Sequence, residues 1–514
     1  MGTAVNRSTD PRWLRPAVAV LLVLLLGVHL ATRDDVVPLG VDAHQYLLHA
    51  ENLVAGRPYA DTGYIQNTDR QLAPPAYPPG YPLLIAPVVA AYGTGRVPMA
   101  VVQILCLLVA VWGFWRVYHR DLAPASGLAF LVLLALNPFL WRMVNRAYSD
   151  LPFLAAVGLA LVFIHRLGEV DRPGAEAGAS GRRWSAYGWA VAAGLACAAA
   201  ILVRILGVAV LPALAWAAVG GGWRRRIGPV AVALGAAVAV SLTVTEAVDW
   251  MDGARIVSGD RPGGGYGAFA GLLASVAELP GRVALRALDY ARMDREVFWN
   301  PFSTARWVSY PLRAVVAVPL VVGVIRRVRR PRPVDVFGVV YLAALLPWSF
   351  GQPRYLIPLV PVVYALVLTG IEALWERVRS GGPVVRLGAG GVVAASVLLL
   401  VGFVGQGVAD AVGRIGRGPV SPRDDGSALV LDRTPPEAVL LTSRDPRPYV
   451  YTTRRPAARA PWEMAEWEAF RRRMGATHVV VTGAERDSAA VWAERFGWRL
   501  AGRSEAADLY APAP

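Results

Sequence analysis

The run LRPAVAVLLVLLLGVHLA at residues 14–31 decides the fold. After Arg15 its one ionisable side chain is His29, and about 18 or more apolar residues are enough to cross a bilayer as a helix. Comparable runs recur along most of the 514 residues, of which 55% are hydrophobic and 17% are charged. Because an average soluble domain has about 25% charged residues, the composition excludes an ordinary soluble enzyme. It predicts a mainly α, polytopic membrane protein.

The apolar runs predict a transmembrane helix bundle of about eleven spans. Residues 14–31 follow Arg7, Arg12 and Arg15 and superficially resemble a signal peptide. The run is longer than a signal core of about 7–15 residues, and no clear cleavage site follows, so we expect an uncleaved first span. The runs occupy residues 14–31, 97–115, 123–140, 150–165, 187–203, 205–220, 228–248, 311–325, 334–350, 355–374 and 387–408.

The basic residues are all arginine, and the formal net charge is +15. Such an excess in a soluble protein suggests nucleic-acid binding, but cytoplasmic loops of membrane proteins are also rich in arginine. The arginines gather in alternate loops, which predicts a cytoplasmic N-terminus, an extracytoplasmic C-terminus and no nucleic-acid partner. The lysine-free, Gly- and Pro-rich composition is typical of a GC-rich bacterial genome, so we expect the bacterial plasma membrane. The predicted cytoplasmic loops contain, among others, Arg116, Arg120, Arg166, Arg224–Arg226, Arg326, Arg327, Arg377 and Arg379.

The predicted domain organisation has two parts. Residues 1–412 form the transmembrane domain, with long outer loops at 32–96 and 249–310, and 413–426 read as a linker. Residues 427–514 read as a small α/β domain on the outer face, with strands at 438–442 and 478–482 around a helix at 461–474. So short a segment buries a modest core, so we expect it to lean on the membrane part. No catalytic constellation is evident in it.

The first outer loop begins with an amphipathic helix. Apolar residues recur with helical spacing from Ala43 to Val54, Gly56 ends the pattern, and such a helix is suited to lie on the membrane surface. Asp42 stands at its start. Two roles stay open for this carboxylate: an N-cap, with Gln45 completing a capping box, or a functional group facing a cavity.

A proline-rich stretch follows, PPAYPPGYPLLIAP at residues 74–87. Prolines at this density prevent a continuous helix and produce a rigid re-entry into the next apolar segment. Irregular backbone at the membrane boundary packs on protein or lines a water-filled cavity. We therefore predict a cavity on the outer face, with Asp42 near it.

Five motifs in this order resemble the GT-C superfamily of integral membrane glycosyltransferases. The similar members are bacterial proteins related to protein O-mannosyltransferases and lipid A aminoarabinose transferases, and the resemblance covers roughly residues 14–410. The motifs are Asp42 with Ala50, Leu53, Gly56 and Tyr59; the re-entry Tyr77–Pro82; Asn145–Phe153; Arg204–Gly207; and Pro353–Leu359.

The resemblance implies transfer of a hexosyl or pentosyl group from a polyprenyl-phosphate carrier to an acceptor hydroxyl at the outer face, with a glycan, lipid or protein as acceptor. By the family's motif, Asp42 is the general base; Ala43 stands where many relatives have a second acid. If Asp42 is not the base, Asp34, Asp35 and Asp150 remain as candidates.

Arginine suits the lipid phosphate because its guanidinium donates two parallel hydrogen bonds. Arg354, Arg204 and Arg146 are the candidates, although an arginine at a helix end can also reach for lipid headgroups. The expected cavity lining is Tyr46, Tyr77, Tyr81, Asp150 and Tyr355, while Asp150 with Ser149 also reads as a helix cap. No cofactor is required and no metal site is indicated; a divalent ion is compatible with the sequence.

Two other functions stay open. A lipid or polysaccharide transporter or flippase would place ionisable residues along a path through the spans, whereas here they gather on one side and no inverted repeat is visible. A non-catalytic subunit of cell-envelope polymer assembly would keep the spans without needing Asp42.

Overall fold

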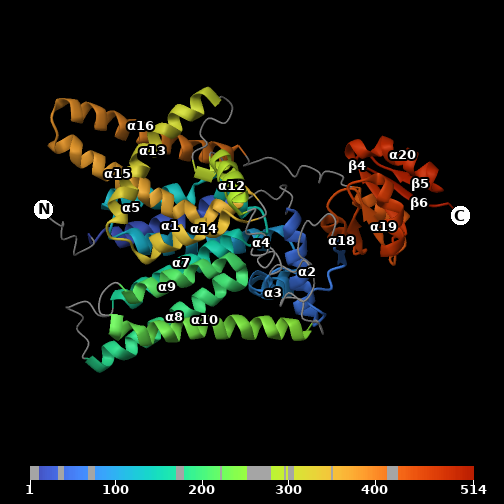
Figure 1. Cartoon of the computed structure of the whole chain (residues 1–514), viewed down its shortest axis with the longest axis horizontal. Coiled ribbons are helices and arrows are strands. Elements are labelled where there is room, and N and C mark those ends of the chain that lie inside the picture. The colour runs from blue at the N-terminus through green and yellow to red at the C-terminus, as the bar shows by residue number, and fades with distance from the viewer. Residues whose placement is uncertain are drawn as a thin grey trace.

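Helices packed side by side form the larger part of the molecule, and a mixed sheet stands at one end (Figure 1). The computed structural model describes residues 11–32, 40–67, 76–169, 179–219, 223–251, 279–294, 297–298, 306–348, 351–413 and 426–513. Asp34, Asp35 and most of the 413–426 linker lie outside these residues.

In the described residues, each predicted apolar run falls mainly on helix, although the run at 123–140 is divided between two helices. Seven described helices are long and apolar enough to cross a membrane, or eight if α5 and α6, bent by 48°, form one span. The runs at 205–220 and 334–350 correspond to shorter apolar helices, so the count of eleven spans stays a prediction. The bundle comprises α1 (Leu14–Ala31), α4 (Arg96–Tyr118), α5 (Pro124–Ala135), α6 (Pro138–Val144), α7 (Asp150–Glu169), α8 (Ala179–Val203), η1 (Ile205–Ala209), α9 (Val210–Val219), α10 (Trp223–Met251), α13 (Arg306–Val328), α14 (Pro333–Leu345), η4 (Pro353–Leu359), α15 (Val360–Ser380) and α16 (Pro383–Val412).

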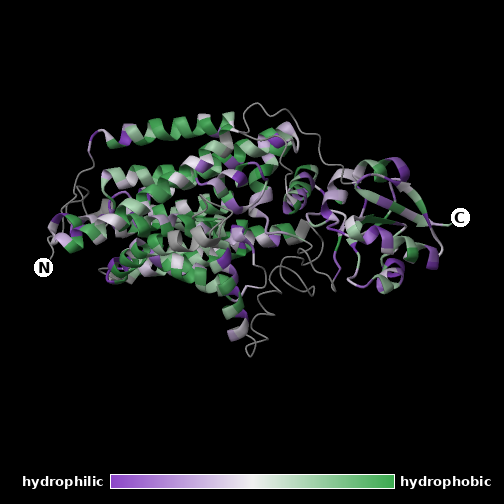
Figure 2. Cartoon of the chain, turned by 90° about the horizontal axis from the view of Figure 1, so that it is seen from above, coloured by the Kyte–Doolittle hydropathy of each residue, from purple (hydrophilic) through white to green (hydrophobic). Residues whose placement is uncertain are grey.

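Helix α7 lies at the centre of the bundle and packs against α4, α8 and α9. Gly113 of α4 faces Gly158 of α7 so closely that a Cβ at Gly113 would stand 3.1 Å from the Gly158 carbonyl carbon. Small residues at such crossings let helix backbones approach in a membrane. By contrast, α1, α10 and α16 leave most of their apolar surface uncovered by protein. That surface is suited to lipid contact. Figure 2 shows that hydrophobic residues predominate along the helices of the bundle.

The first long loop contributes helices α2 (Val41–Ala55) and α3 (Gly80–Tyr92), and the second contributes α12 (Leu279–Asp294). Gly56 ends α2 in the left-handed conformation, as expected, but its N-cap is Gly40 rather than Asp42. Asp42 occupies the first turn, and the predicted capping box with Gln45 is wrong.

Helix α2 is largely enclosed by protein, because nine of its fifteen residues are buried. Its place on the membrane surface stays a prediction. Its polar residues Asp42, Gln45, His49 and Asn52 follow helical spacing and are buried too. They bond within the protein: His49 Nδ1 lies 2.7 Å from the Tyr59 carbonyl, and Asn52 donates to the Asp61 carbonyl. The polar stripe is therefore an internal face.

Helix α3 runs through two of the prolines expected to exclude helix. Pro82 lies in its first turn, where no backbone N–H partner is needed, and Pro87 lies inside it. Within the described part of this stretch, residues 76–79 lie outside the helix.

The sheet has the strand order β1-β3-β2-β4-β6-β5. The first four strands pair in parallel, and β6 pairs antiparallel with β4 and β5. Strands β2 and β4 fall on the two predicted strands, and the helix expected at 461–474 is α19 preceded by the short turn η5. The elements are β1 (Tyr64–Ile65), α17 (Ser427–Arg433), β2 (Leu440–Thr442), α18 (Arg447–Thr453), β3 (Ala457–Arg459), η5 (Met464–Glu466), α19 (Trp467–Met474), β4 (His478–Thr482), η6 (Gly483–Glu485), α20 (Arg486–Arg495), β5 (Trp498–Arg503) and β6 (Ala507–Pro512).

Strand β1 belongs to the first loop, so the loop and the C-terminal segment share one sheet. Tyr64 and Ile65 pair with Ala457 and Ala458, and Asn67 donates to the Arg459 carbonyl at 2.9 Å. Helix α18 packs on α2. This attachment holds α18 along α2, from Asp42 to Glu51.

Candidate active site

Asp42 lies between two arginines that come from opposite parts of the molecule. Arg354 of η4 donates from Nη2 to Asp42 Oδ2, and Arg447 of α18 donates from Nη1 to Oδ1 at 2.7 Å. The three side chains are 12%, 12% and 6% exposed. Each carboxylate oxygen therefore has its own guanidinium in a nearly enclosed site.

A second carboxylate extends this cluster. Asp150 begins α7, and its Oδ1 lies 2.6 Å from Nη1 of Arg204, while its Oδ2 lies 3.7 Å from Nη1 of Arg354. The side chain is therefore engaged in ion pairs, and the interpretation of Asp150 as a helix cap is wrong. Charges alternate along the series Arg447, Asp42, Arg354, Asp150 and Arg204, which leaves a net charge of one positive unit.

Local backbone breaks bring the bundle residues to this end. Arg204 is the extended residue between α8 and η1, and Arg354 follows the extended Gln352 at the start of η4. The return of η1 against α8 needs Gly207, because a Cβ there would stand 2.4 Å from the Ala200 carbonyl carbon. The spacing from Arg204 to Gly207 thus has a packing reason.

Tyrosines surround the charged groups. The guanidinium carbon of Arg354 lies 4.7 Å from the ring centre of Tyr148 and 5.6 Å from that of Tyr355, over which Arg204 also lies. Such ring faces attract cations. Tyr148 belongs to a motif used for the resemblance but was not predicted as a site residue.

The remaining predicted tyrosines pack together beside Asp42. The ring centre of Tyr46 is 4.5 Å from that of Tyr77 and 5.1 Å from that of Tyr81. The Tyr46 hydroxyl is 2.9 Å from Ser149 Oγ, and the Tyr77 hydroxyl accepts a hydrogen bond from Arg447. The structure thus brings all the predicted lining residues to one place.

Arg146, the third predicted phosphate ligand, lies at the edge of the cluster. Its guanidinium carbon is 5.8 Å from the Tyr148 ring centre. Among the described residues it makes no ion pair, and its buried Nε has no hydrogen-bond partner. A buried guanidinium N–H without a partner is able to take an anionic ligand.

The electrostatic state of Asp42 follows from its neighbours. Burial alone would raise its pKa, but the charges and hydrogen bonds of Arg354 and Arg447 outweigh burial and hold the pKa well below the usual range. Burial raises the pKa of both Tyr46 and Tyr77. Asp42 is therefore ionised, and the tyrosines are neutral, at physiological pH.

Sequence reasoning missed Arg447, which brings one residue of the C-terminal segment into contact with Asp42. Asp445 holds its guanidinium with bonds of 2.9 Å to Nε and 2.7 Å to Nη2. No periodicity links residues 42 and 447, so nothing in the sequence indicated their contact.

Three further polar residues of α2 are explained by structure. His49 bonds to Tyr59, Glu51 pairs with Arg454, and the ring of His44 lies beside that of Tyr451. Within the described residues, no group of three or more His, Cys, Asp or Glu side chains could hold a metal ion.

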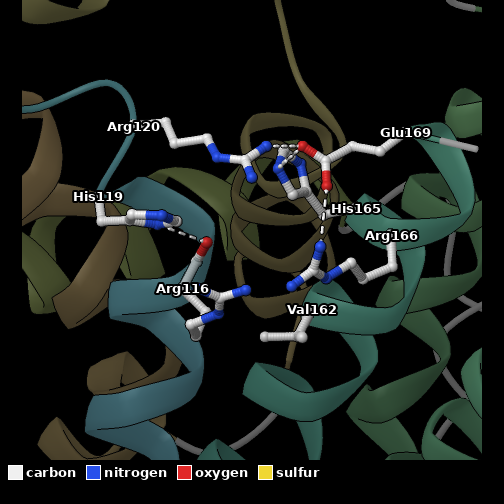
Figure 3. A pocket seen from close by; sticks show the side chains of 7 residues that line it. All are labelled: Arg116, His119, Arg120, Val162, His165, Arg166 and Glu169. Carbon is white, nitrogen blue, oxygen red and sulfur yellow. Dashed lines mark hydrogen bonds and ion pairs between the residues drawn. The ribbon is translucent and has the colours of Figure 1, made fainter. Parts of the chain in front are cut away.

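A basic pocket lies at the other end of α7 (Figure 3). Arg120 and Arg166 both contact Glu169 there, Arg166 at 3.4 Å, and His119 Nδ1 lies 3.0 Å from the Arg116 carbonyl. Helix α7 has 20 residues, and at about 1.5 Å of rise per residue its length separates this pocket from Asp42. These are arginines predicted for cytoplasmic loops.

Two solved structures share this fold. ArnT from Cupriavidus metallidurans bound to undecaprenyl phosphate matches with a TM-score of 0.56 and 14% identity, over 98% of this chain and 100% of that chain. The archaeal oligosaccharyltransferase AglB from Archaeoglobus fulgidus, in complex with an inhibitory peptide and a dolichol-phosphate, matches with a TM-score of 0.59 and 12% identity, over 98% of this chain and 75% of that chain.

These similarities and the apolar helices define a multi-pass membrane protein with the GT-C fold, which confirms the resemblance seen in the sequence. Residues 76–248 match the sequence family described as dolichyl-phosphate-mannose-protein mannosyltransferase. A search of curated proteins finds no match.

Proposed function

We propose that this protein is a glycosyltransferase that moves a sugar from a polyprenyl-phosphate carrier to an acceptor hydroxyl at the outer face of the bacterial plasma membrane. The observation that carries the proposal is the buried Asp42 carboxylate paired with Arg354, inside a ring of tyrosines at one end of an apolar bundle. The family match and the lipid-phosphate complexes of ArnT and AglB support a lipid-linked donor.

The reaction needs a base and a stabilised leaving group. The acceptor oxygen attacks the anomeric carbon, Asp42 accepts the hydroxyl proton, and the bond from the anomeric carbon to the phosphate oxygen breaks. The departing lipid phosphate carries the bonding electrons as negative charge. Positioned guanidinium groups stabilise such developing charge.

Arg354 is the first candidate for this phosphate. Its guanidinium lies over the ring faces of Tyr148 and Tyr355, and these contacts leave its N–H groups able to donate to a phosphate. Arg204 stands one step further away behind Asp150, and the buried Nε of Arg146 supplies a third donor. We propose that these three arginines form the phosphate site.

The two ends of the bundle support the proposed orientation. Arg116, Arg120 and Arg166 gather at the pocket end of α4 and α7, and arginine-rich loops face the cytoplasm. The end with Asp42 then lies outside, together with the C-terminal sheet.

The decisive experiment replaces Asp42 with Asn and measures transfer in membranes supplied with polyprenyl-phosphate-linked mannose, arabinose or galactose. General-base help contributes about 10²–10⁴ in rate, so Asp42→Asn should lower transfer by at least about a hundredfold. Asp61→Asn is the matched control, since Asp61 is exposed in the same loop. A transporter or a non-catalytic subunit would show no loss of sugar transfer specific to Asp42.

A further inference from the structure

We infer that the C-terminal domain completes the active site through Arg447, a positioning residue that keeps hold of Asp42 when Arg354 turns to the donor phosphate. The inference rests on the proposed function and assigns the domain a part in it. The observation behind it is that the two arginines on Asp42 are held very differently.

Arg447 is fixed on its own domain. Asp445 accepts from its Nε, its Nη2 and its backbone N–H. The remaining Nη1 donates to Asp42 at 2.7 Å and to the Tyr77 hydroxyl at 2.9 Å. All three guanidinium nitrogens of Arg447 therefore donate to protein groups. The side chain is only 6% exposed.

Arg354 is held less completely. Besides the bond to Asp42, Arg354 donates one hydrogen bond, from Nε to the side-chain oxygen of Gln352 in an exposed position. Its Nη1 is 3.7 Å from Asp150, which is too long for a good hydrogen bond. Its other neighbours are the ring faces of Tyr148 and Tyr355. Arg354 is therefore the arginine that can exchange the carboxylate for a phosphate, while Arg447 stays in place.

The domain is anchored independently of Arg447. Arg454 donates to both oxygens of Glu51 at 2.6 and 2.9 Å, and the Tyr451 hydroxyl donates to Thr94 at 2.8 Å. Strand β1 adds backbone pairing with β3. These contacts hold α18 against α2 and thereby bring Arg447 to Asp42.

The exchange determines which oxygen of Asp42 accepts the proton. When the phosphate takes Arg354, Oδ2 loses its partner and Oδ1 keeps Arg447. Oδ2 then accepts the proton of the acceptor hydroxyl as the acceptor oxygen bonds to the anomeric carbon and the lipid phosphate leaves against Arg354. Donor binding thus prepares the base, because it removes one of the two charges that suppress proton uptake by Asp42.

A binding experiment tests this without relying on catalysis. The probe is undecaprenyl phosphate, titrated into the purified full-length protein. Asp42 competes with the phosphate for Arg354, so Asp42→Asn should tighten binding by about tenfold. Arg447→Gln leaves Asp42 dependent on Arg354 and should weaken binding by about tenfold in the natural background. In the Asp42→Asn background, Arg447→Gln should change the affinity by less than about threefold.

Three results would overturn the inference. If Arg447→Gln still weakens binding about tenfold beside Asp42→Asn, Arg447 touches the phosphate itself. If neither single variant changes the affinity, the exchange does not occur. If Arg454→Gln, which removes the anchor to Glu51, reproduces the effect of Arg447→Gln, then Arg447 only docks the domain. Arg447→Lys keeps the charge and should give an intermediate affinity, which guards against misfolding of the Gln variant.

The pH dependence of sugar transfer provides a second test of the role of Arg447. Asp42 is faced by Arg354, Arg447, Tyr46, Tyr77 and Tyr148. Loss of Arg447 removes one positive charge and raises the pKa of Asp42, so the acid limb of the rate profile should move to higher pH. An unmoved limb argues for a purely structural Arg447. If no donor gives transfer while the binding pattern holds, the proposed function fails and the exchange stands.

Discussion

Replacing Arg354 tests the phosphate site most directly. Arg354→Ala removes one guanidinium that contacts Asp42 and lies against Tyr148 and Tyr355. A hydrogen bond to a charged group contributes about 1.5–3 kcal/mol, and a bidentate contact to phosphate adds geometric fit. Arg354 must leave Asp42 to make that contact, and this exchange lowers the net gain. We expect donor affinity to fall by about thirtyfold, equivalent to roughly 2 kcal/mol.

Arg354→Lys separates charge from shape. Lysine keeps one positive charge but lacks the planar guanidinium that donates a fork of parallel bonds and packs on ring faces. Its donor affinity should lie between those of the natural protein and the alanine variant, with about tenfold lost. The assay is the Michaelis constant for the lipid-linked sugar, together with direct binding of undecaprenyl phosphate.

The result that would refute this reasoning is an unchanged donor affinity in Arg354→Ala. Arg354 would then serve only to pair Asp42 or to reach for lipid headgroups. Arg326→Ala provides the comparison, since Arg326 lies in the last turn of α13 and pairs with the exposed Glu376 of α15, both apart from the cluster around Asp42. It should leave donor affinity unaltered.

Two further predictions concern stability. Gly207→Ala would force a Cβ into the backbone at Ala200, so the unfolding temperature in detergent should fall, with about 1–3 kcal/mol of stability lost. The control is Gly235→Ala, which should be neutral because a Cβ there meets nothing within 4 Å. Equal effects of the two substitutions would contradict the packing argument. Burial lowers the pKa of His49 to about 4, against the opposing bond to Tyr59. The unfolded chain then binds more protons below about pH 6.5. Stability should fall by about 2 kcal/mol between pH 7.5 and pH 5, and a His49→Gln variant with the same pH slope would contradict this.

The sequence located most of the bundle and most of the site because both leave local signals. Long apolar runs specify helices wherever they occur, and breaks such as that before Arg354 are marked by Pro353. Asp42, Asp150, Arg204 and Arg354 belong to separate motifs, and the structure brings them together. Their catalytic and binding roles stay predictions.

What the sequence did not reveal depends on pairing between distant segments. Strand β1 has two residues, too few for a period-two pattern, and its partner β3 lies far along the chain. The burial of α2 was missed because its apolar stripe is equally suited to lipid or to protein. Its polar face, with His49 and Asn52, becomes an internal face only when the loop folds back to supply carbonyl partners.

The pairing of β1 with β3 also sets the order in which the molecule is assembled. Strand β1 emerges from the ribosome soon after the first span, whereas β3 follows the last bundle helix, so the first loop waits with an open sheet edge while the helices insert. Long-range pairing of this kind forms late. A nascent chain therefore cannot join Arg447 to Asp42 before the bundle helices and α18 have been synthesised, so the fully paired carboxylate marks a molecule in which these distant segments have already met.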